Sequence, residues 1–276
     1  MKVAVLGSSG AMGRFFASYF VARGDEVVGY DLSPPDHPVK GLTLARSTKE
    51  AAERADIVLV AVPMPKTLAV VRRVSRHLRK GSTLIEISSV KGNSLRPLRL
   101  AVSLTGARLL SIHPLFGPAA RRVGMKFCVI GGRSDIASAR RLFPRSVLIP
   151  MSQQGHDRAM AYVLSLVQLT NLAFLSTIAK GMGLEQFGRA ASPIASAQLS
   201  VARATLSQDP SLFSSIQTLN PYARETLSSM VGELTRLQGL LAKNDSKGLQ
   251  RSYEGTSKRQ SRSELQGSLR AVYSLV

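Results

Sequence analysis

A glycine-rich turn near the N-terminus has the residue types and spacing of a dinucleotide-binding site. Gly7, Gly10 and Gly13 follow a short apolar run and precede a stretch with helical periodicity. Glycines at such a turn let the backbone N–H groups of a helix N-terminus approach a pyrophosphate with no side chain in the way. The pattern departs from G-x-G-x-x-G because Ser8 stands where the first glycine of that motif would be.

An acidic residue follows this turn at the distance that a dinucleotide site requires. Asp31 stands eighteen residues past Gly13, at the expected tip of a second strand. A carboxylate there bonds both hydroxyls of an adenosine ribose and repels a 2′-phosphate, which favours NAD over NADP. The alternative is a tight turn followed by a surface aspartate, but strand, turn, helix and acid in this order favour the cofactor site.

A histidine in a proline-rich run is the candidate general base. His113 lies in the run Ser111–Pro118, which contains two prolines and a glycine and follows an expected strand. The carboxyl ends of strands face the ligand crevice of a doubly wound sheet, and a histidine pKa of about 6.5 suits proton transfer. Taken alone, a histidine in such a loop could equally be a surface group.

Two hydroxyls and a cation follow the preceding expected strand. Ser88, Ser89 and Lys91 stand just before Gly92, where that strand ends. We expect these side chains on the same rim as His113, because both strands end at the same edge of the sheet. The alternative is an ordinary polar turn between a strand and a helix.

The elements expected to position these residues alternate short apolar strands with helices. Strands are expected at 3–6, 26–30, 57–62, 83–87, 108–112, 126–130 and 146–149, and helices at 10–23, 49–54, 67–78, 94–104 and 134–143. This rhythm is typical of a parallel sheet with helical crossovers. It predicts an α/β fold in which residues 1–151 form a Rossmann-type, doubly wound dinucleotide-binding domain.

From His156 onward the sequence has long amphipathic stretches and no strand alternation. Helices are expected at 157–182, 184–206, 210–219, 221–243 and 249–274. The first of them is apolar almost all round, so we expect it to be buried, and in a chain of 276 residues this predicts a core shared by a dimer. Residues 152–276 are therefore expected to form an all-helical substrate and dimerisation domain.

The composition is that of an ordinary soluble globular protein. Hydrophobic residues make up 44% and charged residues 20%, which excludes a chain disordered throughout. The uninterrupted apolar runs are about a strand long and the first is too short for a signal peptide, which predicts a cytoplasmic protein with no membrane anchor. One cysteine and four scattered histidines predict neither a disulfide nor a metal site.

The net charge is the unusual feature of the composition. Lysine and arginine number 37 against 17 acidic residues, which gives +20 at pH 7. Such a field favours anions, among them nucleotide cofactors, carboxylate substrates and nucleic acid. The arginines are spread along the chain rather than gathered in a tail, which favours a solvated basic surface over a polyanion-binding role.

Taken together, these motifs resemble the prephenate/arogenate dehydrogenases of tyrosine biosynthesis. In the first half the matching segments are Gly10–Arg14 with Phe16, Asp56–Pro63, Ser89–Gly92 and His113–Pro118. In the second half, the segments that follow the family's helical dimerisation domain in order and spacing are His156–Tyr162, Ser192–Ile194 and Gln208–Phe213. The resemblance extends over nearly the whole chain.

The resemblance implies an oxidative decarboxylation of prephenate or arogenate, with NAD, or alternatively NADP, as cofactor. It implies that His113 takes the proton of the ring hydroxyl as hydride leaves the same carbon, and that loss of carbon dioxide then makes the ring aromatic. Ser89 would hold that hydroxyl and the nicotinamide in register, and Lys91 would support the rim. The residues expected to contact the cofactor are Gly7, Ser9, Gly10, Ala11, Met12, Gly13, Asp31, Val62 and Pro63. A homodimer through the C-terminal helices is implied, with the active site between the two domains.

The sequence departs from the family's pattern at the positions expected to bind substrate. Gln168 stands where the family has a second histidine, and Ala204 where it has an arginine that grips a carboxylate. An arginine–carboxylate bond contributes about 1.5–3 kcal/mol. Arg203 is adjacent, but one helix position turns a side chain by about 100°. Arg122, which follows the His113 run, is the alternative cation, so we treat Gln168, Arg203 and Arg122 as the candidate substrate-binding residues.

Two other functions fit the same residues. The chain could be a related dehydrogenase or reductase that acts on a different anion, which the departures at Gln168 and Ala204 would allow. It could also be a non-catalytic relative that binds NAD or nucleic acid through its basic surface. The rigid run around His113 favours an enzyme, because a binding protein needs no base beside the nicotinamide. Nucleic acid and membrane are therefore not expected as partners.

Overall fold

A computed structural model describes residues 1–33, 35 and 37–274 of the chain. The chain folds into two compact units, Met1–Met160 and Ala161–Val276. The first contains the sheet and the second is helical, so an α/β domain followed by an all-helical domain is confirmed. The expected boundary at residue 151 differs from the division at Met160, because helix α6 (Gln153–Met160) packs on the sheet unit.

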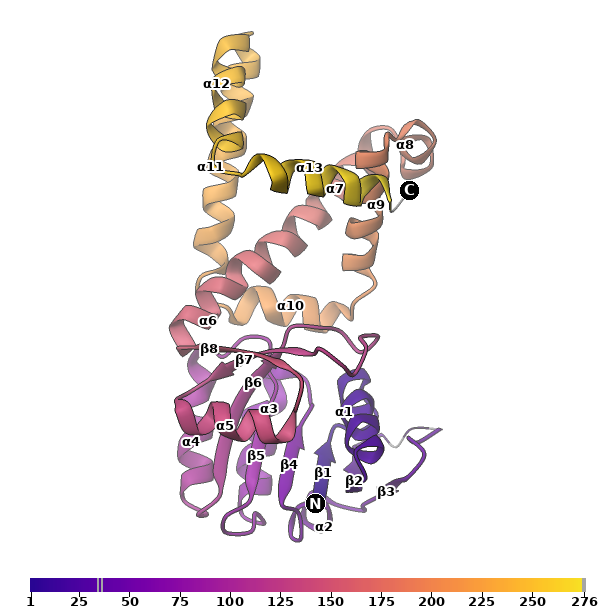
Figure 1. Ribbon diagram of the computed structural model, residues 1–276, viewed down its shortest axis with the longest axis vertical. Coiled ribbons are helices and arrows are strands. Elements are labelled where there is room, and N and C mark those ends of the chain that lie inside the picture. Colours follow the sequence, from indigo (N-terminus) through magenta and orange to yellow (C-terminus); the bar gives the residue numbers. More distant parts are fainter. Residues whose placement is uncertain (34, 36, 275–276) are drawn as a thin grey trace. The chain divides into compact units, whose positions relative to one another are not determined.

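The first unit is built on one eight-stranded sheet with the order β3-β2-β1-β4-β5-β6-β7-β8 (Figure 1). The strands are β1 (Lys2–Leu6), β2 (Glu26–Tyr30), β3 (Leu42–Leu44), β4 (Ile57–Val60), β5 (Thr83–Glu86), β6 (Arg108–Pro114), β7 (Lys126–Ile130) and β8 (Val147–Met151). All neighbouring strands are parallel except β6 and β7. The chain adds β2 and β3 on one side of β1 and then crosses to β4 on the other side. This reversal places a ligand crevice at the carboxyl ends of β1 and β4.

Helices cover both faces of the sheet, which explains why its strands are continuously apolar. On one face lie α1 (Ala11–Ala22) and α5 (Arg133–Leu142), and on the other α2 (Thr48–Ala52), α3 (Met64–Ser75) and α4 (Leu95–Ser103). The first face is closed by a cluster of aromatic rings from α1, β7 and the residue after α5: Phe16, Phe20, Phe127 and Phe143. The strand β4 is buried at all four residues, as expected for a strand covered on both faces.

Two details of the sheet differ from the sequence-based expectation. Strand β3 was not expected, because three residues at the sheet edge are too short to show periodicity. His113 was expected in a loop, but it lies within β6. The strand continues to Pro114 because β7 pairs with it in the antiparallel direction, with His113 opposite Cys128. A strand holds the imidazole more rigidly than a loop would.

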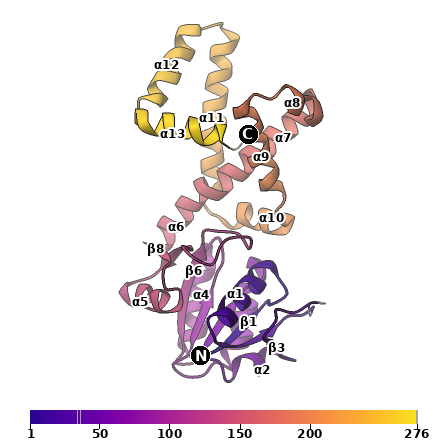
Figure 2. The same cartoon turned by 45° about the vertical axis from the view of Figure 1, so that its right-hand side comes forward.

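The second unit consists of helices (Figure 2). After the π-helical turn Ala161–Leu166 they are α7 (Val167–Gly181), α8 (Leu184–Ala190), α9 (Pro193–Leu206), α10 (Pro210–Leu219), α11 (Ala223–Ala242), α12 (Ser246–Ser257) and α13 (Arg262–Tyr273). Helix α7 packs along α9, and α11 packs along α12. The helix expected at 184–206 is broken before Pro193, where the Ser192 hydroxyl accepts a hydrogen bond from a backbone N–H of α9. The helix expected at 249–274 is broken by a capping box of Ser261 and Glu264.

One continuous helix, Gln153–Gly181, is long and apolar enough to span a membrane by length and composition alone. Its most apolar window has a mean hydropathy of 1.5, and 33% of that window is buried within the chain. The expectation of no such segment rested on uninterrupted apolar runs and did not consider this helix. The core helix of a soluble domain has the same length and composition, so the helix by itself does not indicate a membrane protein.

A buried ion pair fixes the carboxyl end of β6. Lys91 Nζ lies 2.6 Å from Glu86 Oε1 and donates a hydrogen bond of 2.8 Å to the carbonyl oxygen of Ile112. Glu86 also accepts hydrogen bonds from the Ser111 hydroxyl and, at 3.0 Å, from the Ser88 N–H. Lys91 and Glu86 are each 1% exposed, so Lys91 lies in the interior and not on the rim where the sequence placed it. Burial lowers the pKa of Lys91, and the Glu86 carboxylate opposes that effect.

Removing only the cation of this pair should strongly destabilise the protein. Lys91→Met leaves the Glu86 carboxylate buried without its ion-pair partner, which costs about 3–5 kcal/mol. The double variant Lys91→Met/Glu86→Gln removes both charges and should recover most of that loss. Urea unfolding of the two variants measures the difference, and equal destabilisation of both would contradict this account.

Candidate active site

The glycine turn after β1 has the geometry that a bound pyrophosphate requires. Gly7 has a φ of +86°, and a Cβ there would lie 2.5 Å from the carbonyl oxygen of Ala61. A Cβ on Gly13 would overlap the carbonyl oxygen of Gly7, so α1 can approach the turn only with glycine at this position. Gly10 caps α1 without a side chain, and a Cβ there would meet nothing closer than 3.5 Å. The N-terminus of this twelve-residue helix therefore lies at the turn, where its N-cap makes no side-chain hydrogen bond to the described residues.

Asp31 is fixed beside this turn, as the sequence predicted. Its Oδ2 accepts a hydrogen bond of 2.9 Å from the Ser9 N–H, and its Oδ1 accepts one of 3.3 Å from the Ser33 N–H. Each carboxylate oxygen keeps a lone pair for a further donor. The carboxylate thus has the capacity to accept the two hydroxyls of a ribose.

A cleft of about 600 Å³ joins the glycine turn to Asp31. Among its lining residues are the expected Gly7, Ser9, Gly10, Asp31, Val62 and Pro63. Ala11 and Met12 are the first two residues of α1, so their N–H groups belong to the open helix N-terminus. Lys66 and Arg73 from α3 also line the cleft, and sequence analysis did not single them out. The glycine cradle, the helix N-terminus and the carboxylate together fit a dinucleotide such as NAD.

His113 is the terminal member of a buried chain of hydrogen bonds. Its Nδ1 lies 3.0 Å from Nε2 of His156, and Nδ1 of His156 lies 2.9 Å from Oδ1 of Asp157. His113 is 4%, His156 0% and Asp157 2% exposed. Strand β6 supplies the first of these residues and helix α6 the other two, so the chain of bonds joins the sheet to the helix that follows it.

Asp157 also binds the turn that follows β5. Its Oδ1 accepts a hydrogen bond of 2.9 Å from the Lys91 N–H, and its Oδ2 accepts one of 2.8 Å from the Gly92 N–H. Burial would raise the pKa of Asp157, but the hydrogen bonds from His156, Lys91 and Gly92 outweigh it and hold the pKa below its ordinary value. Asp157 is therefore an ionised carboxylate that attaches the start of α6 to the turn after β5.

The surroundings of His113 keep its imidazole neutral. Burial, the Lys91 cation and His156 hold the pKa of His113 well below its ordinary value. A neutral imidazole has a lone pair available for a proton at physiological pH. This protonation state is the one that a general base must have before the reaction begins.

The structure brings together some of the expected catalytic residues and adds others. Ser89 is half-buried in the turn between β5 and Lys91, one strand away from His113. His156 and Asp157 were interpreted in the sequence as the start of a helix, and their part in the site was missed. The adjacent histidine and aspartate in a matching segment were the available signal, but only the packing of α6 on the sheet shows what they contact.

The candidate substrate-binding residues lie in different units. Arg122 is exposed in the segment 115–125 between β6 and β7. In the helical unit Gln168 is buried, its amide bonded to the side chains of Gln208 at 3.0 Å and Gln217 at 2.8 Å. Arg203 is exposed on α9 beside Ala204, which is exposed too. Gln168 thus belongs to an uncharged amide cluster.

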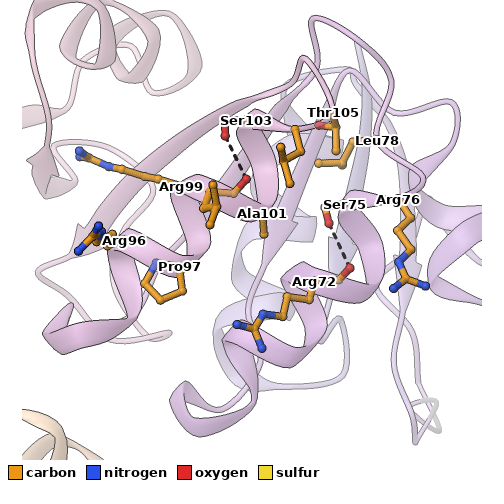
Figure 3. A pocket seen from close by; sticks show the side chains of 12 residues that line it. Arg72, Ser75, Arg76, Leu78, Arg96, Pro97, Arg99, Ala101, Ser103 and Thr105 are labelled. Atoms are coloured by element: carbon orange, nitrogen blue, oxygen red, sulfur yellow. Dashed lines mark hydrogen bonds between the residues drawn. The ribbon is translucent and has the colours of Figure 1, made fainter.

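A second and larger hollow lies between α3 and α4 and has a basic lining (Figure 3). Its volume is about 1370 Å³, and its lining includes Arg72 and Arg76 on one side and Arg96 and Arg99 on the other. Among the described residues that line it there is neither a carboxylate nor a histidine. Arginines that are scattered in the sequence therefore gather at one surface, which carries part of the net charge of +20.

Two models of one protein family match the two halves of the chain. The nucleotide-binding domain of prephenate dehydrogenase matches residues 16–128, and the dimerization domain of prephenate dehydrogenase matches residues 152–254. Together the two matches cover most of the chain, in the order of the two structural units.

Curated relatives and a solved structure agree with these matches. A probable arogenate/prephenate dehydrogenase of Methanocaldococcus jannaschii is 25% identical over 90% of this chain and 58% of its own length. A 4-amino-4-deoxyprephenate dehydrogenase of Streptomyces pristinaespiralis is 24% identical over 88% of this chain and 86% of its own length. The structure of prephenate dehydrogenase from A. aeolicus, in complex with hydroxyphenyl propionate and NAD+, superposes with a TM-score of 0.74 at 17% identity. That superposition covers 94% of this chain and 97% of that one.

The matches cover most of this chain but only part of some relatives. The chain spans a little more than half the length of the first two curated relatives that it matches. The structural likeness, at 17% identity, shows a shared fold. Because both family domains match in order, the chain belongs to the prephenate dehydrogenase family.

Proposed function

We propose that this protein catalyses the NAD-dependent oxidative decarboxylation of prephenate or arogenate in tyrosine biosynthesis. The observation that carries the proposal is the buried, neutral imidazole of His113 at the carboxyl edge of the sheet that also holds the glycine turn. NAD bound in the cleft would supply the hydride acceptor that the reaction needs. The fold, the family and the cofactor cleft support the proposal together.

In the proposed reaction His113, Ser89 and Lys91 would have different roles. His113 would accept the proton of the ring hydroxyl at Nε2 as hydride leaves the same ring carbon, and the loss of carbon dioxide would then make the ring aromatic. Ser89, on the turn beside it, would hold the hydroxyl in place. Lys91 was expected to support the rim of the site. Its cation lies in the interior instead, where it lowers the pKa of His113.

Asp31 supports NAD rather than NADP as the cofactor. Its carboxylate is held in the cleft by two backbone N–H groups, so it cannot easily turn away from a 2′-phosphate. The cations Lys66 and Arg73, which also line the cleft, favour the negatively charged parts of a dinucleotide. NAD is therefore the proposed cofactor, with NADP as the alternative for the assay.

A different substrate of the same chemical class is the second candidate. A relative that matches along 86% of its own length acts, by its name, on 4-amino-4-deoxyprephenate. The uncharged Gln168 cluster in the helical unit favours a substrate that is recognised differently from prephenate. A panel of prephenate, arogenate and 4-amino-4-deoxyprephenate covers both candidates.

We also propose that the protein is a cytoplasmic homodimer. Its helical unit matches a dimerization domain, and its long helix leaves apolar side chains exposed in the single chain. Tyr162, Val163 and Val167 are 58%, 56% and 46% exposed. A second copy would cover this face and account for a helix that is apolar almost all round.

The proposed function predicts that His113 is required for turnover and not for cofactor binding. The purified protein should reduce NAD with at least one acid of the panel, followed by the absorbance of the reduced nicotinamide. His113→Asn should lower kcat by about 10²–10⁴-fold, because a general base contributes that much. NAD affinity, measured by calorimetry, should be unchanged. Absence of turnover with all three acids and both cofactors would refute the proposal.

The glycine turn predicts that two neighbouring substitutions act differently. Gly13→Ala forces a Cβ into the Gly7 carbonyl and should lower the free energy of unfolding by about 3 kcal/mol. Gly10→Ala has room within the protein and should fold normally, but its methyl group would obstruct the pyrophosphate, so NAD affinity should fall. Thermal unfolding and calorimetric titration with NAD separate the two effects. A Gly10→Ala variant with unchanged NAD affinity would argue against pyrophosphate binding here.

Arg122 is the proposed cation for a substrate carboxylate. Arg122→Ala should raise KM for the acid about tenfold or more, with little change in the KM for NAD. Arg108→Ala is the matched control, because Arg108 is exposed at the opposite end of β6 and its loss removes the same charge. An unchanged KM in Arg122→Ala, or an equal rise in both variants, would exclude a direct contact.

A further inference from the structure

The strongest unexplained feature of the site is the pair of buried groups behind His113. His156 is fully buried, and its two ring nitrogens both lie at hydrogen-bond distance from another side chain. A histidine in this environment cannot contact the substrate directly. Its contact with His113 can instead determine the ring orientation and the tautomer of that base.

The protonation state of Asp157 determines the position of each proton in the chain of bonds. An ionised carboxylate only accepts hydrogen bonds, so Nδ1 of His156 must carry a proton. With that single ring proton on His156, its other nitrogen, Nε2, is an acceptor, and Nδ1 of His113 donates to it. The lone pair of a neutral His113 is therefore on Nε2. Among the described residues none is hydrogen-bonded to that nitrogen.

We propose that Asp157 and His156 are positioning residues that fix the ring of His113 and its tautomer, so that Nε2 is the nitrogen that receives the substrate's proton. This inference rests on the proposed function for the identity of the proton donor, the ring hydroxyl. The tautomer itself follows from the contacts within the first unit. The same logic fixes the histidine of a Ser-His-Asp triad, where a carboxylate selects the tautomer of the base.

The chain of bonds also determines where positive charge goes during the reaction. The hydroxyl O–H bond breaks, and the proton forms a bond to Nε2 of His113, which becomes an imidazolium. Its Nδ1–H remains directed at His156, so the charge is shared through His156 toward the Asp157 carboxylate. Without that carboxylate the His113 imidazolium would be poorly stabilised, because the side chain is only 4% exposed to solvent.

Within the described part of the chain, the charged and titratable groups that face His113 come from β7, the segment from β5 to Lys91, and α6. Lys91 and Glu86 lie on the β5 side and form an ion pair with each other. Cys128 lies opposite His113 on β7, and burial raises the pKa of its thiol, which keeps it neutral. His156 and Asp157 come from α6. The Lys91 cation disfavours the imidazolium, and Asp157 is the group in the hydrogen-bonded chain that favours it.

Nitrogen NMR of the protein without substrate tests the tautomer directly. The chain has only four histidines, so 15N-histidine labelling gives few signals, and His156 variants assign the two of interest. At neutral pH we expect His113 to be protonated at Nδ1 and unprotonated at Nε2, and His156 to show the same pattern. A proton on Nε2 of neutral His113 would overturn the proposal. This measurement does not depend on turnover, so it decides the inference even if no acid of the panel is a substrate.

A matched pair of variants tests the consequence for the reaction. The amide of asparagine reaches as far as Nδ1 of histidine and the amide of glutamine as far as Nε2. His156→Asn therefore keeps the donor to Asp157 but loses the acceptor for His113, whereas His156→Gln keeps that acceptor. We expect kcat to fall about 10²-fold or more in His156→Asn and to be largely retained in His156→Gln, with KM for acid and NAD unchanged in both.

The pH dependence separates positioning from a merely structural role. The pKa of His113 in the wild-type protein lies well below its ordinary value, so kcat/KM should fall only at pH values well below about 6.5. His156→Asn should change the pH at which kcat/KM falls on the acid side, and His156→Gln should change that pH less. If both variants lose kcat equally and in proportion to their loss of thermal stability, His156 is only structural and the proposal fails.

Discussion

The site depends on one buried carboxylate, which bonds the turn after β5 directly and reaches His113 on β6 through the neighbouring His156. Asp157 accepts hydrogen bonds from the Lys91 and Gly92 N–H groups and from His156, all at 2.8–2.9 Å. Bonds to an ionised acceptor are short and contribute about 1.5–3 kcal/mol each. They attach the turn after β5 and the start of the long helix to the same point. Asp157 in turn fixes His156, and His156 fixes the imidazole of His113.

Two buried charges lie on either side of the proposed base: the Lys91 cation, which disfavours a protonated His113, and the Asp157 carboxylate, which reaches His113 through His156. Before the reaction the imidazole must be neutral, and burial with the Lys91 cation ensures this. In the proposed reaction the ring would become positive after proton transfer, and Asp157 would stabilise it through His156. Glu86 binds the Lys91 cation in place, so that it repels the imidazolium without facing the substrate.

Local patterns predicted the parts of the site that depend on local geometry. The Gly7 and Gly13 positions follow from a turn that has no room for a Cβ, and Asp31 follows from the length of one strand–helix–strand unit. His113 was predicted from its place at the end of a strand, although the antiparallel pairing with β7 that includes it in β6 was not. Long-range packing determined the rest. The directions of Lys91 and His156 depend on where α6 meets the sheet, and no periodicity in the sequence encodes that contact.

The helical unit shows why single-residue comparison with a family was insufficient at Gln168. This glutamine is one of three, and its amide donates to Gln208 and accepts from Gln217. A histidine at position 168 would have to make hydrogen bonds with both Gln208 and Gln217. The glutamine at this position therefore has to be understood together with the other two. An amide cluster can orient a carboxylate or a hydroxyl, but it supplies no charge. A desolvated carboxylate is stabilised by a nearby cation, and the three glutamines supply none.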